Sequence, residues 1–488
     1  MIKITHDGLL KAILNHAQEI PEKAALIVNN IPVTYKELTY KIMQTAVFLQ
    51  QKGLKRGDTI ILTAKNDVEF VYVYFAAHLL GIINIVTDPK AKTDKIQYII
   101  SLTQPKYIFG HDEELVGVTP VPFKDLDYSG NATSLNLPAL SKDDTGDVMF
   151  TTGTTSNPKG VCLSYYNITS ASENQNAFIH NTKDDIEILG LPLNHAFAIG
   201  RMRCNLLAGA TIIMLGSLSN LALFFKTIER YHATGFTMVP SLWTYIKRLS
   251  GHRIGKYAPQ IKYMELGTAP MSVEDKQELI ELFPDTRIVM NYGLTEAMRS
   301  FFCEFHEIKE NLNTIGRPSN PEKVFAKICD ENGNEMPAGE PGELCVKGNM
   351  VMQRYLLDEE NDKAWFGDYF RTGDFAYHDE KGLYYFVGRK KELINIGGEK
   401  VSPITIEEAI MSLNLVKDCA AVALADKTLG EVPKVYLVAK DKQDDRIIED
   451  IKSKMPDLLQ SYQLPRAYAW IDDIPKTGSG KVQRLLLK

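Results

Sequence analysis

The segment "FTTGTTSNPKGV" at residues 150–161 has the composition of a loop that binds phosphate. It combines Gly153 and the cation of Lys159 with a run of hydroxyl side chains, which can donate hydrogen bonds to phosphate oxygens. Pro158 stands where a Walker A loop needs glycine, and because proline has no N–H, the usual nest of backbone amides cannot form. A surface turn rich in Thr, Ser and Asn would explain the composition but not the Gly-x-x-x-x-Pro-Lys-Gly ending. The hydroxyl residues are Thr151, Thr152, Thr154, Thr155 and Ser156.

A second glycine-rich turn with a lysine, "KTGSGKV", lies near the C-terminus at residues 476–482. It also departs from the Walker pattern, because Pro475 precedes it and Val482 follows the lysine. The Gly-Ser-Gly turn would present Lys481 to a ligand, and a solvated C-terminal tail is the alternative. Taken alone, this segment favours neither.

The elements that must position these loops are amphipathic helices that alternate with short apolar strands. The spacing predicts a helix over 34–54 that stops at Gly53, and a strand over 58–64. The same pairing recurs in "VEFVYVYFAAHLLG" with "IINIV" and in "TDKIQYIISLTQ" with "KYIFG". Further strands are expected at 211–215, 235–240 and 287–293. This alternation predicts a mostly parallel α/β architecture.

The character of the sequence changes after about residue 310, where turn residues and strand-like runs predict a small β subdomain up to residue 390. Beyond a polar patch at 388–391, the expected elements are a helix over 404–413, strands over 419–425 and 434–440, and a helix around 446–460. We therefore expect a large N-terminal domain at 1–390, built of mostly parallel α/β subdomains plus the β subdomain, and a separate small α/β domain at 391–488.

The composition narrows the class of protein. A net charge of −6 argues against a nucleic-acid partner, since phosphate contacts normally need a basic surface. The six cysteines contain no C-x-x-C pair, which favours a reduced, cytoplasmic compartment over disulfides or a zinc site. One apolar stretch at 70–86 is interrupted by His78, Gly81 and Asn84, so we expect a buried helix and strand there and no integral membrane segment.

The order and wording of these segments resemble the adenylate-forming superfamily of acyl- and aryl-CoA synthetases, luciferases and peptide-synthetase adenylation domains. The resemblance runs from about residue 20 to the end, and its wording is closest to the acyl-CoA synthetases. Besides the two loops, it rests on "PLNHAFAIG" (192–200), "LGTAPM" (266–271), "NYGLTEA" (291–297), "GELCVKG" (342–348), "YFRTGD" (369–374) and "GRKKELINIGGEKVSP" (388–403). It implies a two-step reaction: a carboxylate attacks the α-phosphorus of ATP and releases pyrophosphate, and a thiol then displaces AMP from the acyl adenylate.

On the phosphate side, the resemblance implies that the loop at 151–159 holds the β- and γ-phosphates. Lys481 is implied to reach the α-phosphate and the carboxylate oxygens, where two anions meet and need a cation. Glu296 is the expected Mg²⁺ ligand and Thr295 an α-phosphate contact. One carboxylate with phosphate oxygens and waters is a usual way of holding Mg²⁺.

The nucleoside side follows from the same resemblance. Tyr292 offers a face on which adenine can stack, and the turn at 267–270 can bring backbone close to the base. Asp374 is implied to accept both ribose hydroxyls, with Arg389 beside them, although from the residues alone it would be a turn aspartate. The other implied nucleotide contacts are Gly153, Gly267, Thr268, Ala269, Pro270, Asn291 and Gly293.

Two further residues have roles implied by the family. His195 is expected to border the acid's carboxylate and gate it before adenylation, whereas in isolation it would be a packing residue. Lys391 lies where the family has its hinge, about which the small domain is expected to rotate, replacing Lys481 at the site by the "NIGGEKVSP" face. A surface lysine is the alternative for Lys391.

The acid and the thiol are less well specified. No acidic residue follows the 192–200 segment to pair with an ammonium group, so an α-amino acid is disfavoured. Arg201, Arg203 and Arg299 could meet a second anionic or polar group on a small carboxylic acid. Arg201 and Arg203 are two apart, so on a helix they cannot both face the pocket, and Arg299, four residues after Thr295, is the best single candidate. Surface or interdomain ion pairs are the alternative for these arginines. Coenzyme A is the expected acceptor, and the phosphopantetheine of an acyl or aryl carrier protein is the alternative.

The sequence disfavours two other classes of function. A non-enzymatic nucleotide-binding relative would be expected to lack the terminal lysine or the Mg²⁺ carboxylate, and both Lys481 and Glu296 are present. A phosphotransferase is disfavoured because both loops depart from the Walker pattern. We therefore expect a cytoplasmic ligase that uses ATP, Mg²⁺ and coenzyme A.

Overall fold

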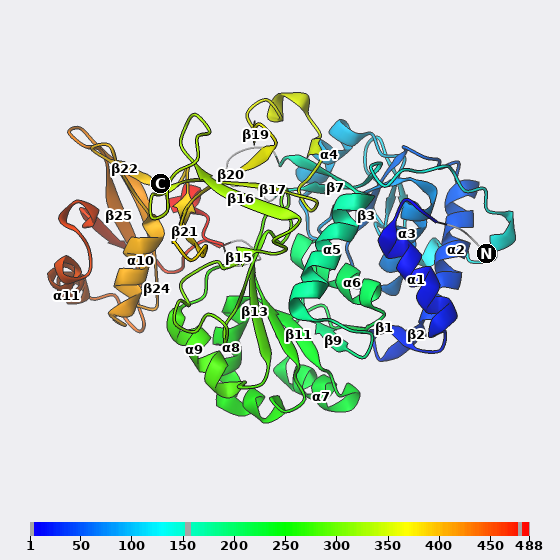
Figure 1. Cartoon of the computed structure of the whole chain (residues 1–488), viewed down its shortest axis with the longest axis horizontal. Coiled ribbons are helices and arrows are strands. Elements are labelled where there is room, and N and C mark those ends of the chain that lie inside the picture. The colour runs from blue at the N-terminus through cyan, green and yellow to red at the C-terminus, as the bar shows by residue number, and fades with distance from the viewer. Residues whose placement is uncertain (1–3, 152–157, 477–480, 488) are drawn as a thin grey trace.

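The computed structural model of the protein describes residues 4–151, 158–476 and 481–487. Within these residues the strands form four sheets, and Figure 1 shows the N-terminus at one end of the molecule and the small C-terminal part, in orange and red, at the other. The predicted α/β fold, with a large N-terminal part and a small C-terminal one, is confirmed.

The largest sheet, which we name the central sheet, is mostly parallel. Strands β13, β12, β11, β9, β10 and β1 run in the same direction, and β14, β15 and β2 add antiparallel edges. In spatial order its strands are β15 (Arg317–Pro318), β14 (Phe301–Glu304), β13 (Arg287–Tyr292), β12 (Tyr263–Leu266), β11 (Gly235–Met238), β9 (Ile186–Leu189), β10 (Thr211–Met214), β1 (Ala24–Val28) and β2 (Ile31–Thr34).

The second sheet, the N-terminal sheet, has a parallel core of β7, β4, β3, β5 and β6. Strand β8 pairs antiparallel with β7, and β18, from far later in the chain, pairs antiparallel with β8. In spatial order the strands are β18 (Arg354–Tyr355), β8 (Gly160–Ser164), β7 (Thr145–Phe150), β4 (Ile83–Thr87), β3 (Thr59–Thr63), β5 (Tyr107–Phe109) and β6 (Thr119–Val121).

The helices of this large part follow the predicted alternation with the strands. Helix α2 begins with a capping box, in which the Thr34 hydroxyl accepts from the Glu37 N–H at 3.1 Å and the Glu37 carboxylate accepts from the Thr34 N–H at 2.8 Å. The helices are α1 (Gly8–Glu19), α2 (Tyr35–Gln51), α3 (Val68–Leu80), α4 (Thr93–Thr103), α5 (Tyr165–Ile179), α6 (Ala196–Ala208), α7 (Leu221–Tyr231), α8 (Pro240–Ser250) and α9 (Val273–Leu282).

The apolar stretch at 70–86 forms most of α3 and then β4, as expected. Side chains all round α3 are buried, and the helix stops at Gly81, whose φ of 69° is the left-handed conformation that glycine adopts without strain. No helix in the described part of the chain is long and apolar enough to cross a bilayer. The prediction of a buried helix followed by a buried strand is therefore confirmed.

The third sheet, the β-subdomain sheet, is antiparallel, with β20 paired to β17, β19 and β21. The last, the C-terminal sheet, has its own apolar core, which includes Ile394, Ile406 and Val435. The β-subdomain strands are β16 (Val324–Cys329), β17 (Gly342–Gly348), β19 (Trp365–Phe366), β20 (Tyr369–His378) and β21 (Tyr384–Arg389). The C-terminal elements are β22 (Ile394–Ile396), β23 (Glu399–Val401), α10 (Pro403–Ser412), β24 (Asp418–Asp426), β25 (Gly430–Val438), α11 (Asp445–Lys454) and β26 (Ala467–Trp470).

Two predicted elements end earlier than expected. The helix expected around 446–460 stops at Lys454, because Pro456 in the next turn has no N–H and cannot continue an α-helix. The strand expected at 235–240 stops at Met238, because Pro240 is already the first residue of α8. The predicted domain boundary after residue 390 falls between β21 and β22, and the mobility of the C-terminal part remains a prediction.

Candidate active site

The predicted nucleotide residues gather where parallel strands of the central sheet end. Strands β12 and β13 are parallel neighbours with Leu266 opposite Met290, so the turn at 267–270 and the segment at 293–296 leave the same edge of the sheet. In open α/β sheets, ligands bind in the crevice outside the carboxyl ends of the strands. Segments about 25 residues apart in the sequence therefore form one wall of a candidate site.

The turn at 267–270 is held in a strained form. Thr268 has a φ of 76°, which a β-branched residue rarely adopts. Gly267 lies directly against Asn291, since a Cβ at Gly267 would be 2.8 Å from the Asn291 amide nitrogen. That nitrogen donates to the Leu266 carbonyl at 3.1 Å and to Glu265 Oε1 at 2.7 Å. Asn291, which the sequence predicts as a nucleotide contact, thus holds the turn in place. Asn291 is in turn held by Glu265, a residue that the sequence analysis does not predict for the site.

Asp374 and Tyr292 meet at the other side of this edge. The Tyr292 hydroxyl donates to Asp374 Oδ2 at 2.6 Å, and Arg389 Nε is 3.9 Å from Asp374 Oδ1. Asp374 lies inside strand β20, opposite Arg389 of β21, so the idea of a turn aspartate is wrong. Burial raises the pKa of Asp374 above its ordinary value, although Arg389 and the Tyr292 hydrogen bond oppose the shift. The resulting buried acceptor suits a pair of hydroxyl donors.

Lys481 reaches this cluster from the far end of the chain. Lys481 is exposed as a residue. The charges of Asp374 and Glu296 act to raise the pKa of its ammonium group, but desolvation of that group and the charge of Arg389 outweigh them and lower the pKa of Lys481 below its ordinary value. The C-terminal part is therefore docked with its predicted catalytic lysine at the edge of the central sheet.

Glu296 is held by the segment around β18. The Glu296 carbonyl accepts from the Met352 N–H at 2.8 Å, and the neighbouring Ala297 forms an isolated bridge with Val351. The carboxylate Oε1 accepts from the Tyr355 hydroxyl at 2.9 Å. A ligating carboxylate oriented by a second residue is the usual arrangement at a metal site. Thr295 precedes it in the same bend and is half-buried.

Lys159 lies beside the same tyrosine. Its Nζ is 4.4 Å from the centre of the Tyr355 ring and 3.7 Å from Glu360 Oε1. The ends of the predicted phosphate loop are closed by Thr151, whose N–H donates to the Lys159 carbonyl at 2.9 Å and whose Oγ1 accepts from the Lys159 N–H at 3.2 Å. The predicted loop residues Thr152, Gly153, Thr154, Thr155 and Ser156 lie outside the described residues.

His195 is the N-cap residue of α6 and is half-buried. Burial lowers the pKa of His195 below 6.5; Asp88 opposes this shift, and Lys481 adds to it. An imidazole with a lowered pKa is neutral at physiological pH, so His195 can border an incoming carboxylate without pairing with it as a cation.

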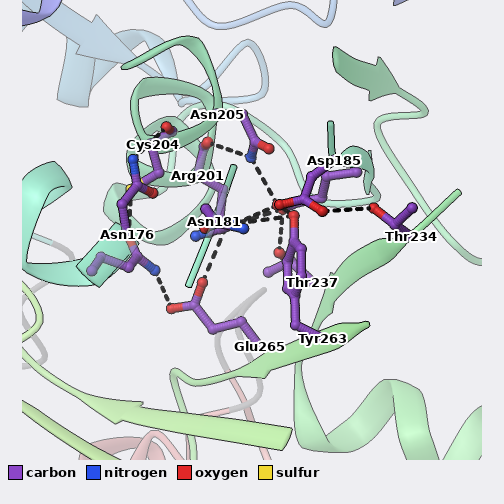
Figure 2. A network of polar contacts seen from close by, with 12 residues as sticks. Asn176, Asn181, Asp185, Arg201, Cys204, Asn205, Thr234, Thr237, Tyr263 and Glu265 are labelled. Carbon is purple, nitrogen blue, oxygen red and sulfur yellow. Dashed lines mark hydrogen bonds and ion pairs between the residues drawn. The ribbon is translucent and has the colours of Figure 1, made fainter. Parts of the chain in front are cut away.

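Arg201 is enclosed by a polar network rather than open to the site (Figure 2). Its Nε donates to Glu187 Oε1 at 3.0 Å and is 3.1 Å from Glu265 Oε2. Arg203, two residues on, turns toward the N-terminal sheet, where it binds Asp147 of β7. The expectation that these arginines do not share a face is correct, but their ion pairs are buried in the interior rather than on the surface. The remaining partners of Glu187 are Asn205, Thr237 and Tyr263.

Arg299 has fewer partners. Its Nη2 donates to the Phe197 carbonyl at 2.8 Å. Its Nε is buried with no hydrogen-bond partner in the part of the chain that the structure describes, and Glu265 Oε1 is 3.8 Å from that nitrogen. Gly200 of α6 makes room for it, since a Cβ there would be 2.2 Å from an Arg299 nitrogen. Arg299 also has a φ of 52°. Strain together with an incompletely paired buried cation is typical of a functional position.

The linker between the two parts carries Lys391, which is exposed. Its neighbour Lys390 is 3.1 Å from Glu343 Oε2, and Arg371 binds the same carboxylate oxygen at 2.8 Å. The linker is thus tied to the β-subdomain sheet one residue before the predicted hinge.

The last two residues of the strained turn at 267–270 are more accessible to solvent. Ala269 is half-buried and Pro270 is exposed.

The metal ligand that the sequence predicts is Glu296. Within residues 4–151, 158–476 and 481–487, no group of three or more His, Cys, Asp or Glu side chains could hold a metal ion. A single carboxylate oriented by Tyr355 fits Mg²⁺ that is bound mainly through phosphate oxygens and water, and it does not fit a zinc site.

Comparisons with known proteins agree with this geometry. The AMP-binding enzyme family matches residues 13–356, and the AMP-binding enzyme C-terminal domain matches residues 405–481. The chain therefore belongs to the AMP-binding enzyme family, and the predicted adenylate-forming superfamily is confirmed.

The relatives narrow the class further. A 2-succinylbenzoate–CoA ligase of Bacillus licheniformis is 28% identical, with 98% of each chain covered. A 4-coumarate–CoA ligase of Nicotiana tabacum is 27% identical over 92% of this chain and 88% of its own. The structure of O-succinylbenzoate CoA synthetase from Bacillus subtilis in complex with ATP and magnesium ion has a TM-score of 0.88 at 24% identity and covers 98% of both chains. The predicted class, an AMP-forming acid–CoA ligase that uses ATP, Mg²⁺ and coenzyme A, is confirmed.

Proposed function

We propose that this protein activates a small carboxylic acid with ATP at the edge of the central sheet and passes the acyl group to coenzyme A. The observation that carries the proposal is the position of Lys481, which lies with Asp374, Glu296 and Arg389 although it is separated from them by up to about 190 residues. A reaction between two anions, the carboxylate of the acid and the phosphates of ATP, requires a cation at such a position.

In the first step, a carboxylate oxygen of the acid attacks the α-phosphorus, and the bond between that phosphorus and the bridging oxygen of pyrophosphate breaks. Lys481 stabilises the charge that builds on the α-phosphoryl oxygens, with Thr295 as a further donor. Asp374 accepts from the ribose hydroxyls, and Tyr292 lies against the adenine. The strained turn at 267–270 brings its backbone to the base. These contacts convert the encounter of acid and ATP into a reaction within one site.

Glu296 would hold Mg²⁺, which neutralises phosphate charge when bound. Lys159 and the hydroxyls of the loop at 151–159 bind the leaving pyrophosphate. His195 borders the acid and, being neutral, leaves its carboxylate free to attack.

In the second step, the thiol sulfur attacks the acyl carbon, the bond to the AMP oxygen breaks, and the thiol proton passes to solvent. We place the hinge at Lys391, because it follows the residue that Glu343 anchors. Rotation there withdraws Lys481 and brings the 395–403 face to the acyl adenylate.

The acid is best described as short, with a second polar or anionic group. Arg299 is the group that would meet it, because its Nε has no hydrogen-bond partner among the described residues and Gly200 leaves it lying against the first turns of α6. One relative is named for 2-succinylbenzoate, an acid with such a second group, and another for 4-coumarate, which carries a phenol.

Free coenzyme A is the acceptor that the relatives favour, and a carrier-protein phosphopantetheine is the alternative. We place the protein in the cytoplasm, because all six cysteines are free and buried, as suits a reducing compartment.

Acid-dependent pyrophosphate release tests this function. A panel of diacids, hydroxy acids, aromatic acids and plain fatty acids should yield pyrophosphate with a subset only, and thioester should form with free coenzyme A at least as fast as with a holo-carrier protein. Pyrophosphate release with no member of the panel would refute the proposal, and a holo-carrier that is greatly preferred would overturn coenzyme A as acceptor.

A further inference from the structure

The segment that follows β18 is fastened to the strand that leaves the phosphate loop. Arg354 and Tyr355 pair with Cys162 and Val161 of β8, and the Leu356 N–H donates to the Gly160 carbonyl at 2.7 Å. Gly160 comes directly after Lys159. The chain at 354–356 therefore moves as one unit with the base of that lysine.

The turn at 355–361 is itself rigid. Asn361 Oδ1 accepts from the Tyr355 N–H at 2.8 Å, and its Nδ2 donates to the carbonyls of Tyr355 and Leu357 at 3.2 and 3.1 Å. The Glu360 N–H donates to the Leu357 carbonyl at 3.1 Å. These backbone and side-chain hydrogen bonds thus fix the position of the Glu360 backbone, from which its side chain extends.

Glu360 points from this turn toward the lysine. Its Oε1 is 3.7 Å from Lys159 Nζ, and its Oε2 is buried without a hydrogen-bond partner in the described structure. The side chain of Glu360 is only 16% exposed, whereas that of Lys159 is 43% exposed. The same ammonium group lies 4.4 Å from the centre of the Tyr355 ring, whose hydroxyl is bonded to Glu296.

A lysine side chain is flexible, and fixing it in one conformation costs rotamer entropy. Without Glu360, the Lys159 ammonium group would sample solvent, since nearly half of its side chain is exposed. With Glu360 and the Tyr355 ring on two sides, the cation is held at a fixed place relative to Glu296. When phosphate binds to a lysine that is already held in place, no further rotamer entropy of that side chain is lost.

We propose that Glu360 is a positioning residue of the nucleotide site, which holds Lys159 over the Tyr355 ring so that the phosphate-binding cation and the Glu296 carboxylate keep a fixed separation. The proposal rests on the function proposed above, in which Lys159 binds the leaving pyrophosphate. Glu360 acts through Lys159 and does not itself touch the substrate.

The experiment uses the full-length protein and Glu360→Gln, which keeps the shape but removes the charge. Glu359→Gln is the matched control, because Glu359 is the adjacent carboxylate in the same turn and is exposed. Binding of inorganic pyrophosphate is measured by calorimetry without acid, coenzyme A or Mg²⁺, and the KM for ATP and kcat are measured separately. Unfolding temperatures show whether each variant is folded.

We expect Glu360→Gln to weaken pyrophosphate binding about tenfold, as loss of one charge-assisted contact does, and to raise the KM for ATP by a similar factor with kcat little changed. Glu359→Gln should match the wild type, and Glu360→Asp should recover part of the affinity. In a Lys159→Gln background, Glu360→Gln should have no further effect, because both changes remove one interaction. If Glu360→Gln does not fold, the Glu360→Asp measurement carries the test.

Unchanged or tighter pyrophosphate binding would overturn the proposal, as would a loss of equal size in the Lys159→Gln background. A wild-type protein that binds no pyrophosphate would overturn it as well. Failure of the proposed function looks different: a protein that binds pyrophosphate through Lys159 and Glu360 yet activates no acid would leave this inference standing.

Discussion

The buried histidine His78 gives the large part of the protein a measurable dependence on pH. It lies near the end of α3, where Nδ1 is 2.8 Å from Asp7 Oδ2 and Nε2 is 3.0 Å from Asp147 Oδ1. An imidazole donates from both nitrogens only when both are protonated, so this geometry requires the cation. Burial alone would lower the pKa of His78, but the hydrogen bonds and charges of Asp147 and Asp7 raise it to about 9.

The size of this pH dependence follows from the difference in the pKa of His78 between the folded and the unfolded protein. The folded protein keeps a proton on His78 up to about pH 9, whereas the unfolded chain releases it near 6.5. Because the folded state binds more protons in this window, the free energy of unfolding falls as pH rises, by about 3 kcal/mol in total at about 1.4 kcal/mol per pH unit. The stabilisation is complete below pH 6.5 and is lost as pH passes 9.

The assay compares the wild type with Asp7→Asn across this pH range by urea unfolding. Asparagine keeps the oxygen that caps α1 by accepting from the N–H groups of Leu9 and Leu10, so the helix start is preserved while one partner of His78 loses its charge. The fall in unfolding free energy should be smaller in Asp7→Asn, and NMR of labelled histidine should show one ring titrating far above 6.5 in the wild type. If every histidine titrates near 6.5, or if the fall in unfolding free energy with pH is as steep in Asp7→Asn as in the wild type, His78 is not held as a cation by these carboxylates.

Three further predictions concern the active site. Lys481→Ala should slow adenylate formation by about a thousandfold while leaving thioester formation from supplied acyl adenylate within a few-fold, as measured by single-turnover kinetics; equal loss in both steps would contradict its role. Asp374→Asn should raise the KM for ATP about tenfold with little change in the KM for the acid, because one charged acceptor of the ribose hydroxyls is lost; a larger effect on the acid would contradict this. Arg299→Met should lower kcat/KM about a hundredfold for acids with a second anionic group and much less for plain monoacids; equal loss for both would show that Arg299 is structural.

Local signals in the sequence were sufficient for most elements of the fold. Helix α2 has its capping box and apolar spacing within one stretch, and α3 is apolar throughout, so each could be predicted from neighbours in sequence. The nucleotide residues Tyr292, Asp374 and Lys481 could be predicted as well, because each lies in a short segment with family wording. Their meeting in space could not be derived from spacing, since it depends on three separate sheets.

The contacts that could not be predicted from the sequence join residues far apart in the chain, which strand pairing brings together. Tyr355 and Glu360 reach Lys159 only because β18 pairs with β8, and nothing near Lys159 in the sequence indicates that. Glu187 and Glu265 lie in short apolar strands. The apolar pattern predicts that these strands are buried, but it does not predict that the two carboxylates pair with Arg201. Buried ion pairs of this kind are invisible to periodicity, which averages over single polar residues.

The products formed from ATP show whether the protein is an AMP-forming acid–CoA ligase. The protein is incubated with ATP, Mg²⁺, coenzyme A and each acid of the panel, and the nucleotide and thioester products are quantified together. We expect AMP and acyl-CoA in equal amounts, formed only when an acid is present and abolished in Lys481→Ala. Formation of ADP, or of AMP without an acid, would contradict it.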